Sequence, residues 1–562
     1  MFCNQCEQTS KGSQLAQILG LHWGTCERDA KGAGCIMAGV CGKTPETSSL
    51  QDLLLHAVRG LSLYAAEGRR VGVVEKEADE ATCRFLSSTL ASANFDPARF
   101  VDAIGQCVSL RARLKEAVAA AGGDVRFADP SAHLMPATDL AGLVKQGEAA
   151  GMVANRDTDE DIGALRQLLL HAIKGVAAHA DRSRVLGQRD EQVHAFVHEG
   201  LAALTDARLG LDDWVGLALK CGEVNLRAME MLDAGNTGSY GHPAPTAVAL
   251  GHVKGTCILV SGHDMKSLAD LLLQTKGAGI TVYTHGEMLP AHGYPELKKH
   301  PHLYGHFGTA WPNQKKDFSR FPGAILLNGN CLQEPEQGYL RNMFTTGAAG
   351  WPGVTHIENG GFGPVAARAL SLPGFASDED RGSVTVGFAR NSMMSLLREA
   401  TEAVKSGAIK RLFLVAGCDG TKPRRNYYTD LVAAAPRDSL VLTLGCGKFR
   451  FLDHEPGRIG GIPRLLDIGQ CNDAYSAIQM ILAMAKALDC SVNDLPLSLV
   501  LSWYGQGMVA ILLTLLHLGV KGIRLGPSLP AFLTPKVMDI LIERFDLKTT
   551  TTADQDLAAM LE

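Results

Sequence analysis

A series of short apolar runs after residue 245 constrains the fold of this 562-residue chain more than any other feature. Each run has the length of a strand and leads into glycine, histidine, cysteine or another polar residue. The runs are GTCILVSGHD (255–264), GITVYTHGEML (279–289), GAILLNGNCL (323–332), RLFLVAGCDG (411–420), SLVLTLGCGKF (439–449) and LSLVLSWYGQG (497–507). Because helical segments separate continuous apolar runs, the pattern predicts buried parallel strands in α/β sheets.

The part of the chain before these runs is helical in its pattern. From about residue 50 to residue 225, apolar residues recur at spacings of three and four. Two segments resemble each other closely, because Leu53–Ala65 reads LLLHAVRGLSLYA and Leu168–Ala180 reads LLLHAIKGVAAHA. The shared LLLHA-x-x-G favours a duplicated helical bundle over the coincidence of two leucine-rich helices.

Two loops suggest where the chain divides. Thr237–Pro245 is dense in glycine and proline, and Ser371–Gly382 combines mixed charges with small residues. A chain of this length has room for roughly three to four domains. We therefore expect a cysteine-rich N-terminal segment with helical bundles over 1–240, a first α/β domain over 241–378 and a second over 379–562.

The charge and hydropathy of the chain argue against several classes of partner. With 54 Lys+Arg against 59 Asp+Glu, the net charge of −5 predicts neither a nucleic acid nor an anionic membrane as partner. The start, MFCNQCEQTS, has no basic and no apolar stretch, so we expect no signal peptide and a cytoplasmic protein. The most apolar stretch, Met508–Val520, is too short to span a bilayer and predicts a buried helix.

Cysteines, a histidine and a glutamate follow the predicted strands where parallel sheets bind ligands, outside the carboxyl ends. These strand-end residues are His263, Glu287, Cys331, Cys418, Cys446 and Cys471. A single cysteine is more often a small buried residue than a ligand. Four that follow glycine, asparagine or glutamine at loop starts are harder to explain by packing. Thiolates together with one imidazole and one carboxylate suit iron.

A second group of cysteines lies near the N-terminus. Cys3 and Cys6 form C-x2-C, Cys35 and Cys41 form C-x5-C, and Cys26 lies between the pairs. The two pairs predict a four-cysteine metal site, for which both zinc and an iron–sulfur cluster remain open. The five intervening residues of the second pair favour iron. The remaining cysteines are expected in the core: Cys83, Cys107, Cys221, Cys257 and Cys490.

Other nucleotide and catalytic motifs are absent or weak. Gly361–Ala366 formally fits G-x-G-x-x-G/A, but a proline occupies its turn, and no convincing strand precedes the acidic cluster that follows. The chain contains no G-x-S-x-G, no Walker loop and no H-E-x-x-H. We therefore expect electrons to come from a separate donor protein.

The chain resembles the hybrid-cluster proteins, also called prismane proteins or hydroxylamine reductases, over essentially its whole length. The motifs that carry the resemblance are MFCNQCEQT, GVCGKTPETSSLQDLLLHAVRG, ILVSGHDMK, VYTHGEMLPAHGYPEL, GNCLQEP, VAGCDGTKPRRNYYTDL, TLGCGKFRF, DIGQCNDAYSA and LSWY. The resemblance implies two three-helix bundles followed by two Rossmann-like α/β domains, related to carbon monoxide dehydrogenases. It also implies a conventional iron–sulfur cluster near the N-terminus and a hybrid iron–sulfur–oxygen cluster where the domains meet.

The same resemblance implies ligands and an activity. The hybrid-cluster ligands would be the six strand-end residues, and Cys418 matches the cysteine that carries a persulfide in the family. The implied reaction is the two-electron reduction of hydroxylamine to ammonia and water, with nitric oxide as a further substrate. A carbon monoxide dehydrogenase-like activity is disfavoured, because such sites need nickel and a different ligand pattern.

Two departures from the family pattern bear on this expectation. Where the family has Glu-Gln-Lys after a Trp-Tyr pair, this chain has Gly505-Gln506-Gly507. Glycine cannot ligate a metal, which leaves a non-catalytic or regulatory iron–sulfur protein as the alternative function. The loop between Cys6 and Cys35 is longer than in the family. The C-x5-C spacing favours [4Fe–4S] over [2Fe–2S] on Cys3, Cys6, Cys35 and Cys41, with Cys26 spare.

Overall fold

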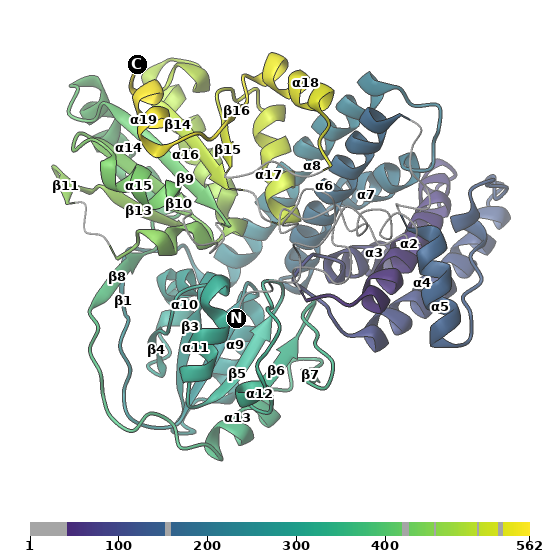
Figure 1. Cartoon of the computed structure of the whole chain (residues 1–562), viewed down its shortest axis with the longest axis horizontal. Coiled ribbons are helices and arrows are strands. Elements are labelled where there is room, and N and C mark those ends of the chain that lie inside the picture. Colours follow the sequence, from purple (N-terminus) through teal and green to yellow (C-terminus); the bar gives the residue numbers. More distant parts are fainter. Residues whose placement is uncertain (1–41, 152–158, 419–425, 454–456, 503–504, 527–531) are drawn as a thin grey trace, which may run out of the picture.

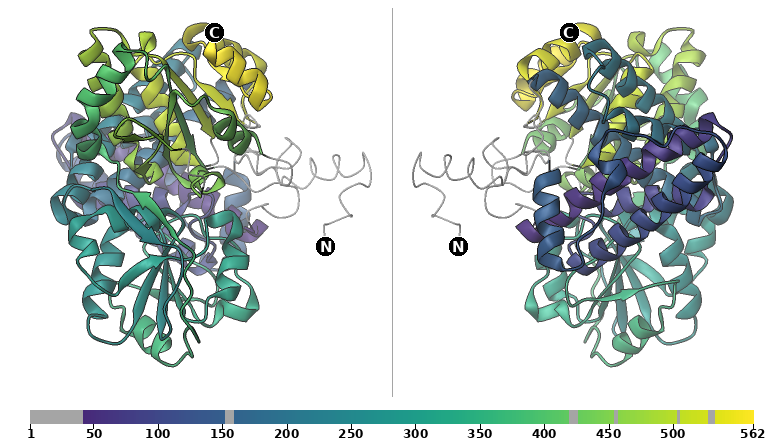
Figure 2. Two further views of the ribbon diagram at one scale, coloured as in Figure 1. Left: turned by 90° about the vertical axis from the view of Figure 1, so that its left-hand side faces the viewer. Right: turned by 90° about the vertical axis from the view of Figure 1, so that its right-hand side faces the viewer.

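Figure 1 shows a computed structural model of the chain, which describes residues 42–151, 159–418, 426–453, 457–502, 505–526 and 532–562. The described residues form a helical part and two α/β parts, each built around its own sheet. The α/β parts lie one above the other, and the helical part packs alongside both of them (Figures 1 and 2). The predicted fold class, helical bundles followed by two Rossmann-like units, is confirmed.

The helical part consists of two sets of three helices with matching lengths. The sets are α2 (Pro45–Arg70), α3 (Lys76–Ser88) and α4 (Pro97–Ala120), then α6 (Glu160–Val185), α7 (Glu191–Ala203) and α8 (Leu211–Tyr240), with α5 (Leu140–Ala150) between them. Helices α2 and α6 each have 26 residues, and α3 and α7 each have 13. The side chains of Thr44 and Asp159 cap α2 and α6 by accepting hydrogen bonds from first-turn amides. The predicted duplication is therefore present in the structure.

The glycine shared by the two LLLHA-x-x-G segments serves close packing in both sets. A Cβ atom on Gly60 would lie 2.0 Å from the carbonyl oxygen of Ser131. A Cβ atom on Gly175 would lie 2.8 Å from Cβ of Ala510 and 2.9 Å from the carbonyl oxygen of Gln506. Both helices can approach their neighbours this closely only because these positions lack a side chain.

The two sets also pack crosswise, with α3 against α6 and α7 against α2. Where α3 and α7 meet, Nε2 of His198 lies 3.1 Å from Asp79, and the thiol of Cys83 lies 3.6 Å from Nδ1 of His194. Asp79 and His194 are the fourth residues of their helices, and Cys83 and His198 are the eighth. Equivalent positions of the two sets thus face each other across an approximate twofold relation.

The first sheet has eight strands in the order β7-β6-β5-β2-β3-β4-β1-β8, and only β8 is antiparallel to its neighbour. Its strands are β1 (Thr246–Ala249), β2 (Cys257–Gly262), β3 (Thr281–His285), β4 (Leu303–His306), β5 (Ala324–Asn328), β6 (Met343–Thr346), β7 (Thr355–Ile357) and β8 (Ser383–Val386). Its helices are α9 (Met265–Gln274), α10 (Pro295–Lys298), α11 (Gln314–Arg320), α12 (Gln337–Leu340) and α13 (Gly363–Leu370). Strands β2 and β5 are buried along their whole length, as expected for a sheet covered on both faces.

The second sheet has six parallel strands in the order β13-β10-β9-β14-β15-β16. These are β9 (Arg411–Gly417), β10 (Ser439–Leu444), β13 (Leu465–Gly469), β14 (Leu497–Ser502), β15 (Arg524–Gly526) and β16 (Lys548–Thr549), while β11 (Arg458–Ile459) and β12 (Ile462–Pro463) form a separate pair. The helices of this part are α14 (Arg390–Lys405), α15 (Tyr427–Ala434), α16 (Ala474–Leu488), α17 (Gln506–His517), α18 (Pro535–Phe545) and α19 (Ala553–Leu561).

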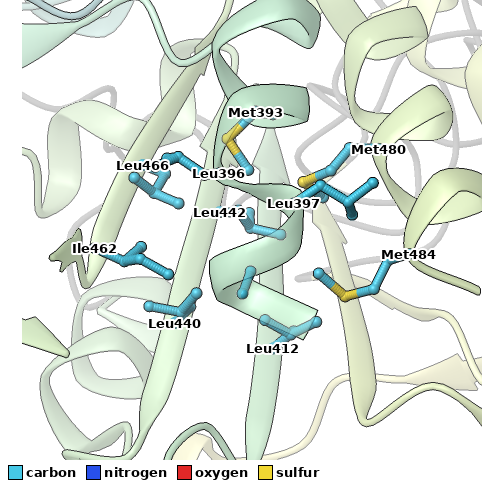
Figure 3. Close-up of a pocket in the computed structure, with 11 residues that line it drawn as sticks. Met393, Leu396, Leu397, Leu412, Leu440, Leu442, Ile462, Leu466, Met480 and Met484 are labelled. Carbon is cyan, nitrogen blue, oxygen red and sulfur yellow. The ribbon is translucent and has the colours of Figure 1, made fainter. Parts of the chain in front are cut away.

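Alternate residues of β9 cover the two faces of the second sheet. Phe413 packs in one apolar cluster with residues of α15 and α19, and Leu412 packs in another with residues of α14 and α16. Figure 3 shows a small pocket on the latter face, and Met393 of α14, Met484 of α16 and the strand residues Leu412 and Leu440 are among the residues that line it. Only leucine, isoleucine, methionine and alanine side chains line the pocket, so it belongs to the packing of the core.

The last helices and strands bear on the division into domains. The predicted buried helix over Met508–Val520 is present as α17, which is buried over Met508–Leu516 but ends at the exposed His517. Helix α17 packs against α6 and α8 of the helical part. The hydroxyl of Thr514 donates to the carbonyl oxygen of Gly222 at 2.8 Å, across this contact. Strand β8 follows residue 378 but pairs with β1 of the first sheet. We therefore propose that the boundary between the two α/β domains lies after β8 rather than after residue 378.

Candidate metal centre

The six strand-end residues all follow parallel strands at the carboxyl ends of the two sheets. In the first sheet, His263 follows β2, Glu287 follows β3 and Cys331 follows β5, and these three strands are neighbours in the order β5-β2-β3. In the second sheet, the neighbours β13, β10 and β9 precede Cys471, Cys446 and Cys418. Each sheet thus contributes three ligand candidates from three adjacent strands, where ligands bind in such folds.

The structure brings residues of both sheets together. Ligand atoms of His263, Glu287 and Cys471 all lie within 4.8 Å of one another. The side chains of His263 and Glu287 are buried, with 3% exposure each. The backbone amide of Cys471 donates to Oε2 of Glu287 at 2.7 Å, which joins the two sheets directly.

The other three cysteines gather beside this group. Cys331, Cys418 and Cys446 pack in one cluster with Ala310 and Trp311. A hydrogen bond with Cys446 is the largest cause that holds the pKa of Cys331 well below its usual range, although burial opposes it. The same hydrogen bond, followed by burial, raises the pKa of Cys446 well above its usual range. One thiol therefore retains its proton while its neighbour readily becomes a thiolate, the form that binds metals.

Backbone geometry at Cys331 is unusual. Its φ angle of 75° lies in the left-handed region, which a non-glycine residue rarely adopts. Nε2 of the buried Gln314 donates to the carbonyl oxygen of Cys331 at 3.0 Å, and the next amide, Leu332, donates to the carbonyl oxygen of Ser92 at 2.9 Å. These bonds hold the strained loop in place, and such strain is common at functional sites.

Two unpartnered polar atoms indicate that the site accommodates an additional group. Nδ1 of His263 and Oε1 of Glu287 are buried and have no hydrogen-bond partner among the residues that the structure describes. Buried polar atoms normally have partners, and leaving one unpaired costs about 1–3 kcal/mol. Four thiols, an imidazole and a carboxylate are also the mixed donor set that iron accepts. The residues therefore fit an iron–sulfur group.

Gly505, where the family has a glutamate, lies at the same edge of the second sheet. Strand β14 pairs with β9 up to Ser502 and Gly417, and the amide of Cys418 donates to the carbonyl oxygen of Ser502 at 3.3 Å. Gly505 is the N-cap residue of α17, three residues after Ser502, with φ −124° and ψ 156°. A Cβ atom on Gly505 would meet no atom of the described residues within 4 Å, and the same holds for Gly507. Among the described residues, no side chain occupies the space beside the two glycines.

The remaining cysteines are only partly described. Cys3, Cys6, Cys26, Cys35 and Cys41 lie outside the described residues. Cys83, Cys107, Cys221 and Cys257 are buried, as predicted for core residues. Cys490 is half-buried at the edge of the core, so its expected place in the interior is only partly met.

The sequence pattern did not single out several polar residues around the site. Lys448 is fully buried, and its Nζ donates to Asp467 at 2.5 Å and to the carbonyl oxygen of Gly469 at 2.7 Å. Gln470 and Arg182 also contact the ligand loops. Lys448 and Gln470 could have been noticed because they lie within two residues of Cys446 and Cys471. Arg182 has no such signal, because it belongs to a helix far away in the sequence.

Comparisons with known proteins agree with the observed fold. A model of the Prismane/CO dehydrogenase family matches residues 1–558. A hydroxylamine reductase of Syntrophobacter fumaroxidans is 56% identical over 561 residues, and one of Methanocella arvoryzae is 53% identical over 562 residues, each covering 100% of both chains. Carbon monoxide dehydrogenase IV from Carboxydothermus hydrogenoformans is similar in fold, with a TM-score of 0.56 at 14% identity over 99% of this chain and 93% of that one.

The comparisons also define how far the likeness extends. A nickel-free carbon monoxide dehydrogenase from Thermococcus sp. AM4 aligns with a TM-score of 0.55 at 16% identity, again over 99% of this chain and 93% of the other. Across the described ranges, no helix is both long enough and apolar enough to cross a membrane. The family match and the relatives extend over essentially the whole sequence, so the chain belongs to the Prismane/CO dehydrogenase family.

Proposed function

We propose that the protein is an oxidoreductase that reduces hydroxylamine to ammonia and water. The reaction consumes two electrons and two protons and breaks the N–O bond. Relatives that are 53–56% identical over their full length are named hydroxylamine reductase, which supports this activity. The observation that carries the proposal is the meeting of His263 and Glu287 from one sheet with Cys471 from the other, all within 4.8 Å.

We assign the hybrid iron–sulfur–oxygen cluster to this place, with the six strand-end residues as its ligands: His263, Glu287, Cys331, Cys418, Cys446 and Cys471. When bound, such a cluster supplies electrons and Lewis-acidic iron for cleavage of the N–O bond. The unpartnered Nδ1 of His263 and Oε1 of Glu287 support the assignment, because a metal would satisfy both.

The residues around the ligands have separate tasks. Trp311 and Phe449 pack against the cysteine cluster and limit the access of water to it. The buried ammonium group of Lys448 brings positive charge to a place where thiolates and Glu287 collect negative charge, which favours their ionised forms.

For electron entry, we propose a [4Fe–4S] cluster on Cys3, Cys6, Cys35 and Cys41, with [2Fe–2S] as the less favoured form. The C-x2-C and C-x5-C spacings support this cluster. A separate protein would deliver the electrons. The expectations of a cytoplasmic location and of no nucleic-acid partner stay predictions from the sequence.

An anaerobic assay with a reduced viologen dye as electron donor tests the proposed function. Iron-loaded protein should convert hydroxylamine to ammonia, and Cys418→Ala should lose most of this activity. Cys490→Ala, which changes a cysteine outside the site, is the matched control and should stay active. Absence of ammonia from wild-type protein with an intact hybrid cluster would instead favour the regulatory alternative. Nitric oxide as second substrate would show whether the activity extends to it.

A further inference from the structure

We propose that Arg182 and Gln470 are positioning residues that hold the ligand loops of the two α/β parts in register with each other and with the helical part. The proposal rests on the metal centre assigned above, but it concerns residues that ligate nothing themselves. Arg182 lies in the last turn of α6 in the helical part, and Gln470 lies between β13 and Cys471 in the second α/β part.

Arg182 connects the helical part to both sheets. Its Nη2 donates to Oδ1 of Asn330 at 2.7 Å, and its Nη1 donates to Oδ1 of Asn472 at 3.1 Å. Asn330 immediately precedes Cys331, and Asn472 immediately follows Cys471. Because the guanidinium group is planar and rigid, its two bonds fix the distance between these two ligand loops.

Gln470 connects the second sheet to the other two ligand loops of the first. Its Nε2 donates to the carbonyl oxygen of Glu287 at 2.6 Å and to that of His263 at 3.2 Å. Its Oε1 accepts a hydrogen bond from Nδ2 of Asn472 at 3.2 Å. The side chain of Gln470 is buried, with 1% exposure, so these bonds do not compete with bulk water.

The two residues form one continuous network. Asn472 accepts from Arg182 and donates to Gln470, so the network runs from α6 through the loop after β13 to the loops after β2 and β3. Through Asn330 it also reaches the strained loop at Cys331. Four of the six proposed ligands are therefore attached to a single set of hydrogen bonds that crosses every part of the chain.

The charge of Arg182 adds an electrostatic effect to the positional one. Both described hydrogen bonds of Arg182 go to neutral side-chain amides. Its positive charge acts on the sulfur atom of Cys471 and also on the buried carboxyl group of Asp264. A cation near a redox centre favours the reduced, more negative form, so its removal should lower the reduction potential.

The test measures the centre directly as well as turnover. Full-length, iron-loaded Arg182→Gln and Arg182→Lys are compared with wild-type protein by iron content, EPR spectroscopy and redox titration of the hybrid cluster. We expect Arg182→Gln to lower the midpoint potential and kcat, the latter by about 10- to 100-fold, with little change in KM. Arg182→Lys should keep the potential close to that of wild type, because it keeps the charge. It should still alter the EPR spectrum, because lysine cannot bridge both asparagines.

Matched controls separate positioning from general stability. Arg184→Gln removes an arginine two residues along α6 that pairs only with Asp181 among described residues, and it should leave the spectrum, potential and kcat unchanged. Gln470→Leu should lose iron or broaden the spectrum. Gln274→Leu, which removes a glutamine that bonds two backbone groups far from the site, should do neither.

Two results would overturn the proposal. One is a spectrum, a potential and a kcat of Arg182→Gln that all equal those of wild type. The other is a wild-type protein that assembles no hybrid cluster. A wild-type protein that holds the cluster but does not reduce hydroxylamine would refute the proposed function alone, because the spectrum and the potential still report on Arg182 and Gln470.

Discussion

Glu287 and Cys471, 184 residues apart in sequence, are joined by a 2.7 Å hydrogen bond from the amide of Cys471 to Oε2 of Glu287. One oxygen of the carboxylate thus fixes a loop of the second sheet, while the other, Oε1, has no partner among the described residues. A single side chain therefore joins the two sheets and still offers an atom to a metal.

Because the two carboxylate oxygens of Glu287 have different roles, two substitutions of this residue should have different effects. Glu287→Gln keeps an acceptor for the Cys471 amide but loses the negative charge, so the fold should persist while iron content falls. Glu287→Ala loses both, and the free energy of unfolding should drop further, by about 1–3 kcal/mol. Iron analysis and urea unfolding of the two variants measure these effects. Equal iron content in Glu287→Gln and wild type would contradict the role of Glu287 as a ligand.

Gly505 should accept a larger side chain. Its extended backbone, with φ −124°, is allowed for any residue, and a Cβ atom there meets no atom of the described part of the chain within 4 Å. Gly505→Glu should therefore change the free energy of unfolding by no more than about 0.5 kcal/mol. Because Gly505 follows β14, which pairs with the strand that precedes Cys418, the new glutamate should also change the hybrid-cluster spectrum and raise turnover. An unchanged spectrum and rate would refute a ligand role at this position.

A contrasting glycine provides the control. A Cβ atom on Gly222 of α8 would lie 2.1 Å from the carbonyl oxygen of Leu513 in α17. Gly222→Ala must push the two helices apart, so it should destabilise the protein by about 1–3 kcal/mol. Urea unfolding of Gly505→Glu and Gly222→Ala tests whether a side chain is tolerated at Gly505 but not at Gly222.

The spacing of the N-terminal cysteines leads to a prediction about Cys26. If Cys3, Cys6, Cys35 and Cys41 hold the cluster, Cys26→Ala should keep the iron and sulfide content of wild type, whereas Cys35→Ala should lose about four of each. Iron and sulfide analysis of both variants tests this. Loss of the cluster in Cys26→Ala would make Cys26 a ligand.

The positions of the six strand-end residues could be predicted because their cause is local. Each follows an apolar run that forms a parallel strand, and parallel strands bring their carboxyl ends to one edge. The local sequence alone was enough to place His263 and Cys446 at such an edge. That the edges of two separate sheets face each other was implied only by the resemblance to a family.

Other features lacked a local cause. Arg182 and Asn330 are 148 residues apart, and a hydrogen bond between them leaves no periodic pattern in the sequence. Lys448 is fully buried although lysine is normally exposed, because Asp467 compensates its charge from another strand. Strand β8 follows a charged loop that suggested a boundary, yet backbone pairing of His252 with Glu379 returns that loop to the first sheet.

The buried pair of Lys448 and Asp467 should be sensitive to loss of one partner. Both side chains have 0% exposure, and the distance from Nζ to Oδ1 is 2.5 Å. Lys448→Met leaves an unpaired buried carboxylate and should lower the free energy of unfolding by about 3–5 kcal/mol. The double variant Lys448→Met/Asp467→Asn removes that charge and should recover most of the loss. A double variant no more stable than the single one, in equilibrium urea unfolding, would contradict this account.

Burial of His171 predicts a loss of stability in mild acid. Burial, and to a lesser extent the charge of Lys174, lowers the pKa of His171 to about 3. The unfolded chain takes up a proton below about pH 6.5, whereas the folded chain does not. The contribution of the neutral His171 to the free energy of unfolding is therefore complete above that pH. As the pH falls below it, this contribution declines by about 1.4 kcal/mol per pH unit.

Replacing the imidazole should remove this part of the pH dependence. Neither ring nitrogen of His171 has a hydrogen-bond partner among the described residues, so His171→Leu breaks no hydrogen bond in that part of the chain and should not destabilise the protein at neutral pH. At about pH 5 the variant should exceed wild type by about 2 kcal/mol in the free energy of unfolding. Exposed His133→Leu is the control and should show no such gain. If wild type and His171→Leu differ in the free energy of unfolding by the same amount at both pH values, the folded chain protonates His171 after all.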